Sequence, residues 1–172
     1  NFKKFTQIAH NGIDNAFFLN NAFKPAKLNI KPFIINSFDL TNTRKVTYKD
    51  YRIVRLAHRQ LDVDSFKGFL KKGLSMFKTV KKYDYISDYP DDYLHLYSNT
   101  EVTFSDRVHA CVATLIFGGK AQYYDDSDRS YLFDRINLSD IRKKPVTIDK
   151  KFIESEKENQ IKFVNTILDK IQ

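Results

Sequence analysis

The sequence predicts an α+β fold with a small, mainly antiparallel sheet or partly open barrel in its C-terminal half. Apolar residues recur at helical spacing over 65–82 and again over 149–171, which predicts amphipathic helices before and after the sheet. The run 108–117 is apolar on both faces, which is typical of a strand in the middle of a sheet. With 172 residues, 42% of them hydrophobic, the chain has the size and the apolar content of one domain.

Three parts follow one another along this expected domain 1–172. Residues 1–82 are basic and mainly helical, residues 83–148 are acidic and rich in strands, and residues 149–171 form the last helix. The sequence contains no repeat, no low-complexity tract and no Gly/Ser linker, which favours a single domain.

In the basic part, Pro25 and Pro32 indicate an extended connection, and 33–38 predicts a short strand. Residues 47–61 place their apolar side chains on one helical face, so a helix is expected there. The clearest helix pattern lies at 65–82, where an apolar stripe accompanies a row of lysines.

In the acidic part, Pro90 indicates a loop and 93–97 a short strand. The buried strand 108–117 ends at two consecutive glycines. Residues 121–124 and 131–138 then predict a β-hairpin around an acidic turn.

The charge of the chain is strongly segregated, although its net value is only +8. Residues 1–82 contain 17 Lys and Arg against 5 Asp, a net charge of +12, whereas residues 83–135 carry −6 and residues 136–172 carry +2. Like charges repel in a compact chain, so this bias indicates either a polyanionic partner or mutual neutralisation of the basic and acidic parts.

The basic part is the strongest candidate for binding nucleic acid. Positive charges along a surface suit a phosphate backbone, because counterion release then drives binding, and exposed rings can stack on bases. The bland alternative is a solvated lysine face over an apolar core. The candidate nucleic-acid-binding residues are Arg52, Arg55, Arg59, Lys67, Lys71, Lys78, Lys82, Tyr83 and Tyr85.

The acidic turn is the strongest candidate for enzymatic chemistry. Asp125, Asp126 and Asp128 are weak candidate metal ligands, since adjacent carboxylates at a hairpin tip can hold a divalent ion. The string Tyr123-Tyr124-Asp125-Asp126 resembles the Tyr-x-Asp-Asp hairpin of polymerase palm domains. Aspartates are also ordinary turn residues that cap the local backbone.

Other motifs are missing from the sequence. The four histidines are not at metal-ligand spacing, and neither a Walker loop, a GxGxxG fingerprint nor a GxSxG elbow occurs, so we expect no cofactor. Cys111 is the single cysteine, which excludes an internal disulfide. It lies in an apolar run, so we expect an inert core residue. The absence of a disulfide framework fits an intracellular compartment, with organelle import or processed export left open. The longest apolar runs are too short for a transmembrane segment.

Part of the acidic region resembles OB-fold single-strand-binding domains of the replication protein A middle-subunit and telomeric type. The residues that carry the resemblance are 108–113 as a first strand, 124–127 as the acidic turn and 131–136 as a third strand. A strand meander closed by the last helix also looks like a pleckstrin-homology-type barrel. Either resemblance implies binding rather than catalysis.

The function expected from the sequence is therefore that of a non-catalytic domain that binds nucleic acid, most readily single strands. The first alternative is an accessory subunit of a larger assembly, whose basic part meets an acidic protein partner. The second is a metal-dependent enzyme that uses the acidic turn.

Overall fold

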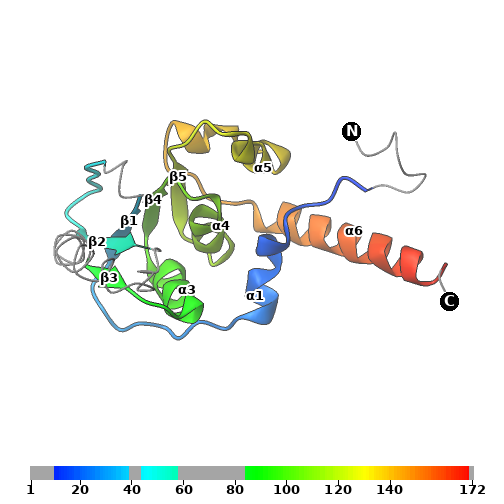
Figure 1. Cartoon of the computed structure of the whole chain (residues 1–172), viewed down its shortest axis with the longest axis horizontal. Coiled ribbons are helices and arrows are strands. Elements are labelled where there is room, and N and C mark those ends of the chain that lie inside the picture. Colours follow the sequence, from blue (N-terminus) through cyan, green and yellow to red (C-terminus); the bar gives the residue numbers. More distant parts are fainter. Residues whose placement is uncertain (1–9, 39–43, 58–83, 171–172) are drawn as a thin grey trace, which may run out of the picture.

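The computed structural model describes residues 10–38, 44–57 and 84–170 (Figure 1). Its centre is a five-stranded sheet in the order β3-β2-β1-β4-β5, in which every neighbouring pair of strands is parallel. The strands are β1 Phe33–Ser37, β2 Arg52–Ala57, β3 Tyr85–Ile86, β4 Val102–Ser105 and β5 Lys120–Tyr123. The expected antiparallel sheet or open barrel in the C-terminal half is therefore wrong, because the strands are parallel and span both halves of the chain.

The two central strands are apolar because both of their faces are covered. In β1, Phe33 and Ile35 face one side and Ile34 the other, and the three side chains are at most 2% exposed. All four residues of β4 are buried as well. Near-continuous burial of this kind is typical of parallel strands covered on both faces. The strand expected at 33–38 is confirmed.

Helices connect the strands that follow β3. Helix α3, Pro90–Asn99, leads from β3 to β4, and helix α4, Val108–Ile116, leads from β4 to β5. The two helices pack against each other on one face of the sheet. The strands expected at 93–97 and 108–117 are thus wrong, since both segments are helical.

The sequence predicts a strand at α4 because this helix is buried at every position except His109. Eight of its nine residues are buried, so it shows no polar stripe to reveal a period of 3.6 residues. Its end shows the helical signal instead: Gly118 has φ +98°, and the N–H groups of Gly118 and Gly119 donate to Leu115 and Thr114. This positive φ and these bonds are typical of a glycine that ends a helix.

The other face of the sheet is covered by the segment that precedes β2. Val46, Tyr48 and Tyr51 pack with Ile34 and Phe104 in an apolar cluster on this face. The helix expected at 47–61 is wrong, because 52–57 form β2 and residues 58–61 lie outside the described residues. The helix expected at 65–82 lies outside them entirely.

The chain after β5 wraps around the outer side of α4 (Figure 1). It forms the short helices η3 Asp128–Ser130, α5 Tyr131–Arg135 and η4 Ser139–Arg142. Together with η2 Asn15–Phe18, α1 Leu19–Ala22 and the start of the last helix, they enclose the main core, in which Phe17, Leu115 and Phe133 are fully buried. The hairpin expected at 121–124 and 131–138 is wrong: its first half is β5, and its second half contains α5.

The last helix, α6, spans Lys150–Leu168 and confirms the amphipathic helix expected near the C-terminus. Ile153 is buried in the main core, whereas Ile161, Val164 and Leu168 on its outer half are about half exposed. Lys157 is only 2% exposed, and its Nζ donates to Asn20 at 2.7 Å, to Asn21 at 3.0 Å and to Glu154 at 2.8 Å. These bonds join α6 to α1 and satisfy a buried charge. Among the described helices, none is long and apolar enough to cross a membrane.

Candidate functional site

The strand order reverses direction at one point in the sheet, between β1 and β4. From β1 the chain proceeds to β2 and β3 on one side, and from β4 it proceeds to β5 on the other side. The connections therefore diverge at the carboxyl ends of β1 and β4, which lie side by side. In open parallel sheets, ligands bind in the crevice outside such a switch point.

Buried hydroxyl groups brace the two strand ends at this point. Ser105 Oγ donates to the carbonyl oxygen of Ser37 at 2.6 Å and accepts from the N–H of Arg107 at 2.9 Å. The hydroxyl of Tyr97, on α3, donates to Ser37 Oγ at 3.2 Å. Both serines are fully buried. This network fixes β1, β4, α3 and the beginning of α4 relative to one another.

Helix α4 starts immediately after this network and directs its N-terminus toward the carboxyl edge. Arg107 is its N-cap residue and forms no side-chain cap bond. The charge of Arg107 also acts on Tyr97: burial raises the pKa of the Tyr97 hydroxyl, and the Ser37 bond and Arg107 oppose this rise. A helix N-terminus carries about half a positive elementary charge, so Arg107 and the N-terminus of α4 bring positive charge to this point, beside the carboxylate of Asp106.

His109 lies in the first turn of α4 and is largely exposed. Its side chain is 74% accessible, and its Nε2 lies 3.8 Å from a carboxylate oxygen of Asp14. The other carboxylate oxygen of Asp14 accepts from the N–H of Ala16 at 2.7 Å and caps η2. Asp14 is thereby held in place, and it connects His109 to η2.

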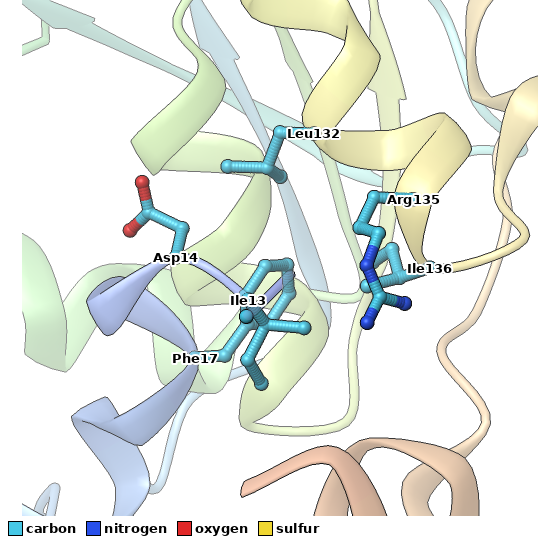
Figure 2. Close-up of a pocket in the computed structure, with 7 residues that line it drawn as sticks. Ile13, Asp14, Phe17, Leu132, Arg135 and Ile136 are labelled. Carbon is cyan, nitrogen blue, oxygen red and sulfur yellow. The ribbon is translucent and has the colours of Figure 1, made fainter. Parts of the chain in front are cut away.

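A hollow of about 380 Å³ opens next to Asp14. Figure 2 shows the apolar side chains of Ile13, Phe17 and Leu132 around it, with Asp14 and Arg135 on opposite sides. The guanidinium of Arg135 donates to the carbonyl oxygen of Asn11 at 2.8 Å and pairs with Glu156, so its charge is already compensated. The hollow therefore offers mainly apolar contact, and its lining residue Asp14 connects it to His109 in the first turn of α4.

Aromatic and acidic side chains border the crevice on the side of β5. The ring of Tyr124 packs edge-on against Phe38 at 5.4 Å, and the Arg44 guanidinium lies 5.0 Å from the Tyr124 ring centroid. Asp125 accepts from the hydroxyl of Tyr123 at 3.1 Å. A hydrogen bond from the Ser127 side chain and the bond from Tyr123 lower the pKa of Asp125, which keeps it ionised.

The carboxyl ends of β2 and β3 are held by Tyr93 of α3. Its hydroxyl donates to the carbonyl oxygen of Ala57 at 2.5 Å and accepts from the N–H of Ser87 at 2.8 Å. Asp92 accepts from the hydroxyls of Ser87 at 2.5 Å and Tyr85 at 2.8 Å. These bonds fix the backbone at this part of the carboxyl edge. The side chains that form them already have hydrogen-bond partners.

The structure describes three of the expected nucleic-acid-binding residues. Arg52 and Arg55 lie exposed on β2, and Arg55 pairs with Asp84 at 3.3 Å. Tyr85 is half-buried, with its ring against Tyr93 and its hydroxyl bonded to Asp92, so it offers little free face for stacking. The remaining six, Arg59, Lys67, Lys71, Lys78, Lys82 and Tyr83, lie outside the described residues.

The acidic turn is a connection between β5 and η3 rather than a hairpin tip. Asp126 and Asp128 are exposed, while Asp125 is bonded to Tyr123. Over 10–38, 44–57 and 84–170, no group of three or more His, Cys, Asp or Glu side chains is arranged to hold a metal ion. The segments 108–113 and 131–136, which carry the resemblance to OB-folds, belong mainly to helices α4 and α5.

Sequence reasoning missed Arg107, His109 and the two serines. The signal was present, because Ser105 and Asp106 before an apolar run are typical of a helix start. A strand at 108–117 would have placed His109 within a sheet, whereas the helix places it in the first turn beside the carboxyl edge.

Comparisons with known proteins identify no relative of this chain. The chain matches no protein-family model, and neither the curated proteins nor the solved structures searched give a significant match. The fold and the geometry of the site are therefore the basis for inferring a function.

Proposed function

We propose that the protein binds a small ligand with a phosphate or carboxylate group at the carboxyl edge of the sheet. The observation that carries the proposal is the strand order β3-β2-β1-β4-β5, with α4 starting where the order reverses. The N-terminus of α4 and Arg107 would receive the anionic group, since helix N-termini and guanidinium groups bind such anions well. His109 stands at the rim of the site.

The side chains around the crevice favour a compact ligand over a dinucleotide. The connection after β1 starts with buried Phe38 where dinucleotide-binding sheets carry a glycine-rich turn. The anion would therefore bind at α4, after β4, rather than after β1. The adjoining apolar hollow near Phe17 and Leu132 would receive the organic part of the ligand.

The test is a calorimetric titration of the full chain with inorganic phosphate, pyrophosphate and oxalate. Arg107→Gln should weaken the tightest of these about tenfold or more, because a charge-assisted bond is lost. Exposed His109→Gln should weaken binding with little change in melting temperature. Arg52→Gln, on exposed β2, is the matched control and should bind as the unchanged chain does. Equal weakening by Arg52→Gln, or no binding of any probe, would refute the proposal.

A second candidate is nucleic-acid binding by the basic part, and it is favoured by the net charge of +12 over residues 1–82. Arg52 is the informative described residue, because it is exposed and has no ion pair with another described residue. If it contacts phosphate, Arg52→Gln should weaken oligonucleotide binding and reduce the slope of log K against log salt by about one. An affinity that does not change with salt would exclude this candidate.

A further inference from the structure

A second hollow, of about 490 Å³, lies at the opposite, amino edge of the sheet. The connection between α1 and β1 forms one wall through residues 25–28 and 30–32. The end of α3 and the residues that follow it, 98–101, form another wall, and the turn 117–120 before β5 closes the hollow. Figure 1 shows this connection running past α3 toward β1. The hollow is thus separated from the carboxyl edge by the length of the strands.

The walls of this hollow are fastened by hydrogen bonds. The Asn99 side chain accepts from the N–H of Leu28 at 2.8 Å and donates to the carbonyl oxygen of Ala26 at 2.8 Å. The N–H of Ala26 donates to His95 Nδ1 at 3.0 Å. Buried Thr100 donates to the carbonyl oxygen of Phe33 at 3.1 Å. The hollow is therefore largely formed before any ligand arrives, as binding sites for small molecules usually are.

Four lysines surround the hollow. Lys27, Lys31 and Lys120 line it, and Lys150 Nζ lies 3.3 Å from the position that a Cβ atom on Gly118 would occupy. All four are exposed, and none forms an ion pair with another described residue. Glu101 is the single acidic residue in the lining.

The positive charge of the four lysines is larger than the negative charge of the groups around the hollow. Helices α3 and α4 both end at this edge, and each helix C-terminus carries about half a negative elementary charge. Those two ends and Glu101 together offset about two of the four positive charges. Asp149, next to Lys150, already accepts from the N–H groups of Lys151 and Phe152 as the cap of α6. A surplus of positive charge therefore remains at the hollow.

We propose that this hollow is a second binding site, which takes a small anion with several charges: a di- or triphosphate group or a tricarboxylate. Its volume is within the range of roughly 300–1,000 Å³ that is typical of small-molecule sites. Lysine ammonium groups on several sides would donate charge-assisted hydrogen bonds to the anionic oxygens. The site is independent of the proposed site at the carboxyl edge, because none of its lining residues belongs to that site.

The experiment is a calorimetric titration of the full chain at low salt with inorganic tripolyphosphate and, separately, with citrate. The double variant Lys31→Gln/Lys120→Gln should weaken the tighter probe about tenfold or more, because two charge-assisted contacts are lost. Glu101→Gln should strengthen binding, because it removes the carboxylate that opposes the anion. The tighter probe identifies the group that the site prefers, phosphate or carboxylate.

Matched controls separate a site from general attraction by a basic protein. Lys162→Gln/Lys170→Gln removes the same charge from the outer half of α6 and the turn that follows it, and Glu158→Gln matches the acidic substitution. Both controls should leave binding unchanged. The proposal is wrong if neither probe binds, or if the controls change the affinity as much as the hollow variants do. It is also wrong if Arg107→Gln abolishes binding while the lysine variant retains it, since the anion then binds at the carboxyl edge.

Discussion

At the scale of single residues, buried hydroxyl groups hold the strand ends at the carboxyl edge. The hydroxyls of Ser105 and Tyr93 donate to backbone carbonyl oxygens at the carboxyl edge, and the hydroxyl of Ser37 accepts from Tyr97. Hydrogen bonds of this kind contribute about 1 kcal/mol each, but a buried hydroxyl without a partner costs more. The edge is therefore rigid around Arg107 and His109, which is the condition for a preorganised site.

The pair of Arg55 and Asp84 gives a prediction at the same scale. Burial alone would raise the pKa of Asp84, but hydrogen bonds from the Arg55 backbone and guanidinium outweigh it and lower the pKa. A carboxyl with a lowered pKa in the folded state stabilises the fold above its unfolded pKa of about 4, and this contribution is lost as pH falls through the folded value.

Arg55→Gln should therefore raise the pKa of Asp84 toward its ordinary value, as measured by carboxyl NMR titration. Because Arg55 is half exposed, the loss of unfolding free energy at pH 7 should stay below about 1 kcal/mol in urea denaturation. The loss should shrink as pH falls through the lowered folded pKa of Asp84, because below that value the carboxyl is protonated in both proteins. Arg52→Gln is the comparison and should raise the pKa of Asp84 less, because Arg52 lowers it through its charge alone. An Asp84 pKa that Arg55→Gln does not alter would contradict the role of this pair.

At the scale of elements, the sequence could be read correctly where a segment has a clear apolar period or follows a strong local signal such as a proline. Helix α6 was predicted within a few residues because its stripe has a clear period. Strand β1 was predicted because it is short and lies soon after Pro32. The candidate site depends on α4, which is buried at every position except His109 and therefore shows no clear period, so the sequence does not reveal its first turn or Arg107.

In other segments, tertiary contacts determine whether a helix or a strand forms. The segment 52–57 has helical apolar spacing, but it pairs with β1 and β3 and becomes a strand. Pro90 followed by Asp91 and Asp92 is a typical helix start, but the many Tyr and Asp residues around it favour turns, so the sequence pattern predicts a loop where α3 begins. Parallel pairing joins strands that are distant in sequence, and local patterns do not contain that information.

The cap of α6 gives the prediction at this scale. Asp149 accepts from the N–H groups of Lys151 at 2.9 Å and Phe152 at 3.2 Å. Asp149→Ala should lower the free energy of unfolding by about 1 kcal/mol, because two amide groups lose their partner at the positive end of the helix. Asp149→Asn should retain most of the stability. Asp169→Ala, at the other end of α6, is the control, since an acidic residue near a helix C-terminus is not stabilising. Equal losses at both ends in denaturant titration would contradict the capping role.

At the scale of the whole molecule, the two proposed sites differ in character and lie at opposite edges of one sheet. The carboxyl edge combines Arg107, a helix N-terminus and an apolar hollow, whereas the amino edge combines lysines with a polar hollow. Both proposals concern anions. The basic residues that they use are brought to the two edges by the parallel sheet, and their positions do not follow from the charge of each stretch of sequence. Arg107 and Lys120 lie in the acidic stretch 83–135, which composition alone had set apart from anion binding.

Cys111 provides a probe of the stability of this arrangement. It lies in the middle of α4, is fully buried, and its thiol is near the carbonyl oxygen of Gln122 at 3.8 Å. Burial, together with the charge of Asp106, raises the pKa of the Cys111 thiol, so the reactive thiolate is suppressed in the folded protein. Because α4 joins the main core to the sheet, exposing this sulfur requires the core to open.

A thiol reagent such as Ellman's reagent should therefore modify Cys111 at least about a thousandfold more slowly in native buffer than in guanidinium, because the reaction follows the open fraction of molecules. Tripolyphosphate, if it binds the folded chain at the amino edge, should slow the reaction further, by a factor of 1 + [L]/Kd. Lys31→Gln/Lys120→Gln should remove that slowing, whereas Lys162→Gln/Lys170→Gln should retain it. Rapid modification in native buffer would show that α4 is accessible and would contradict the buried position on which the whole arrangement depends.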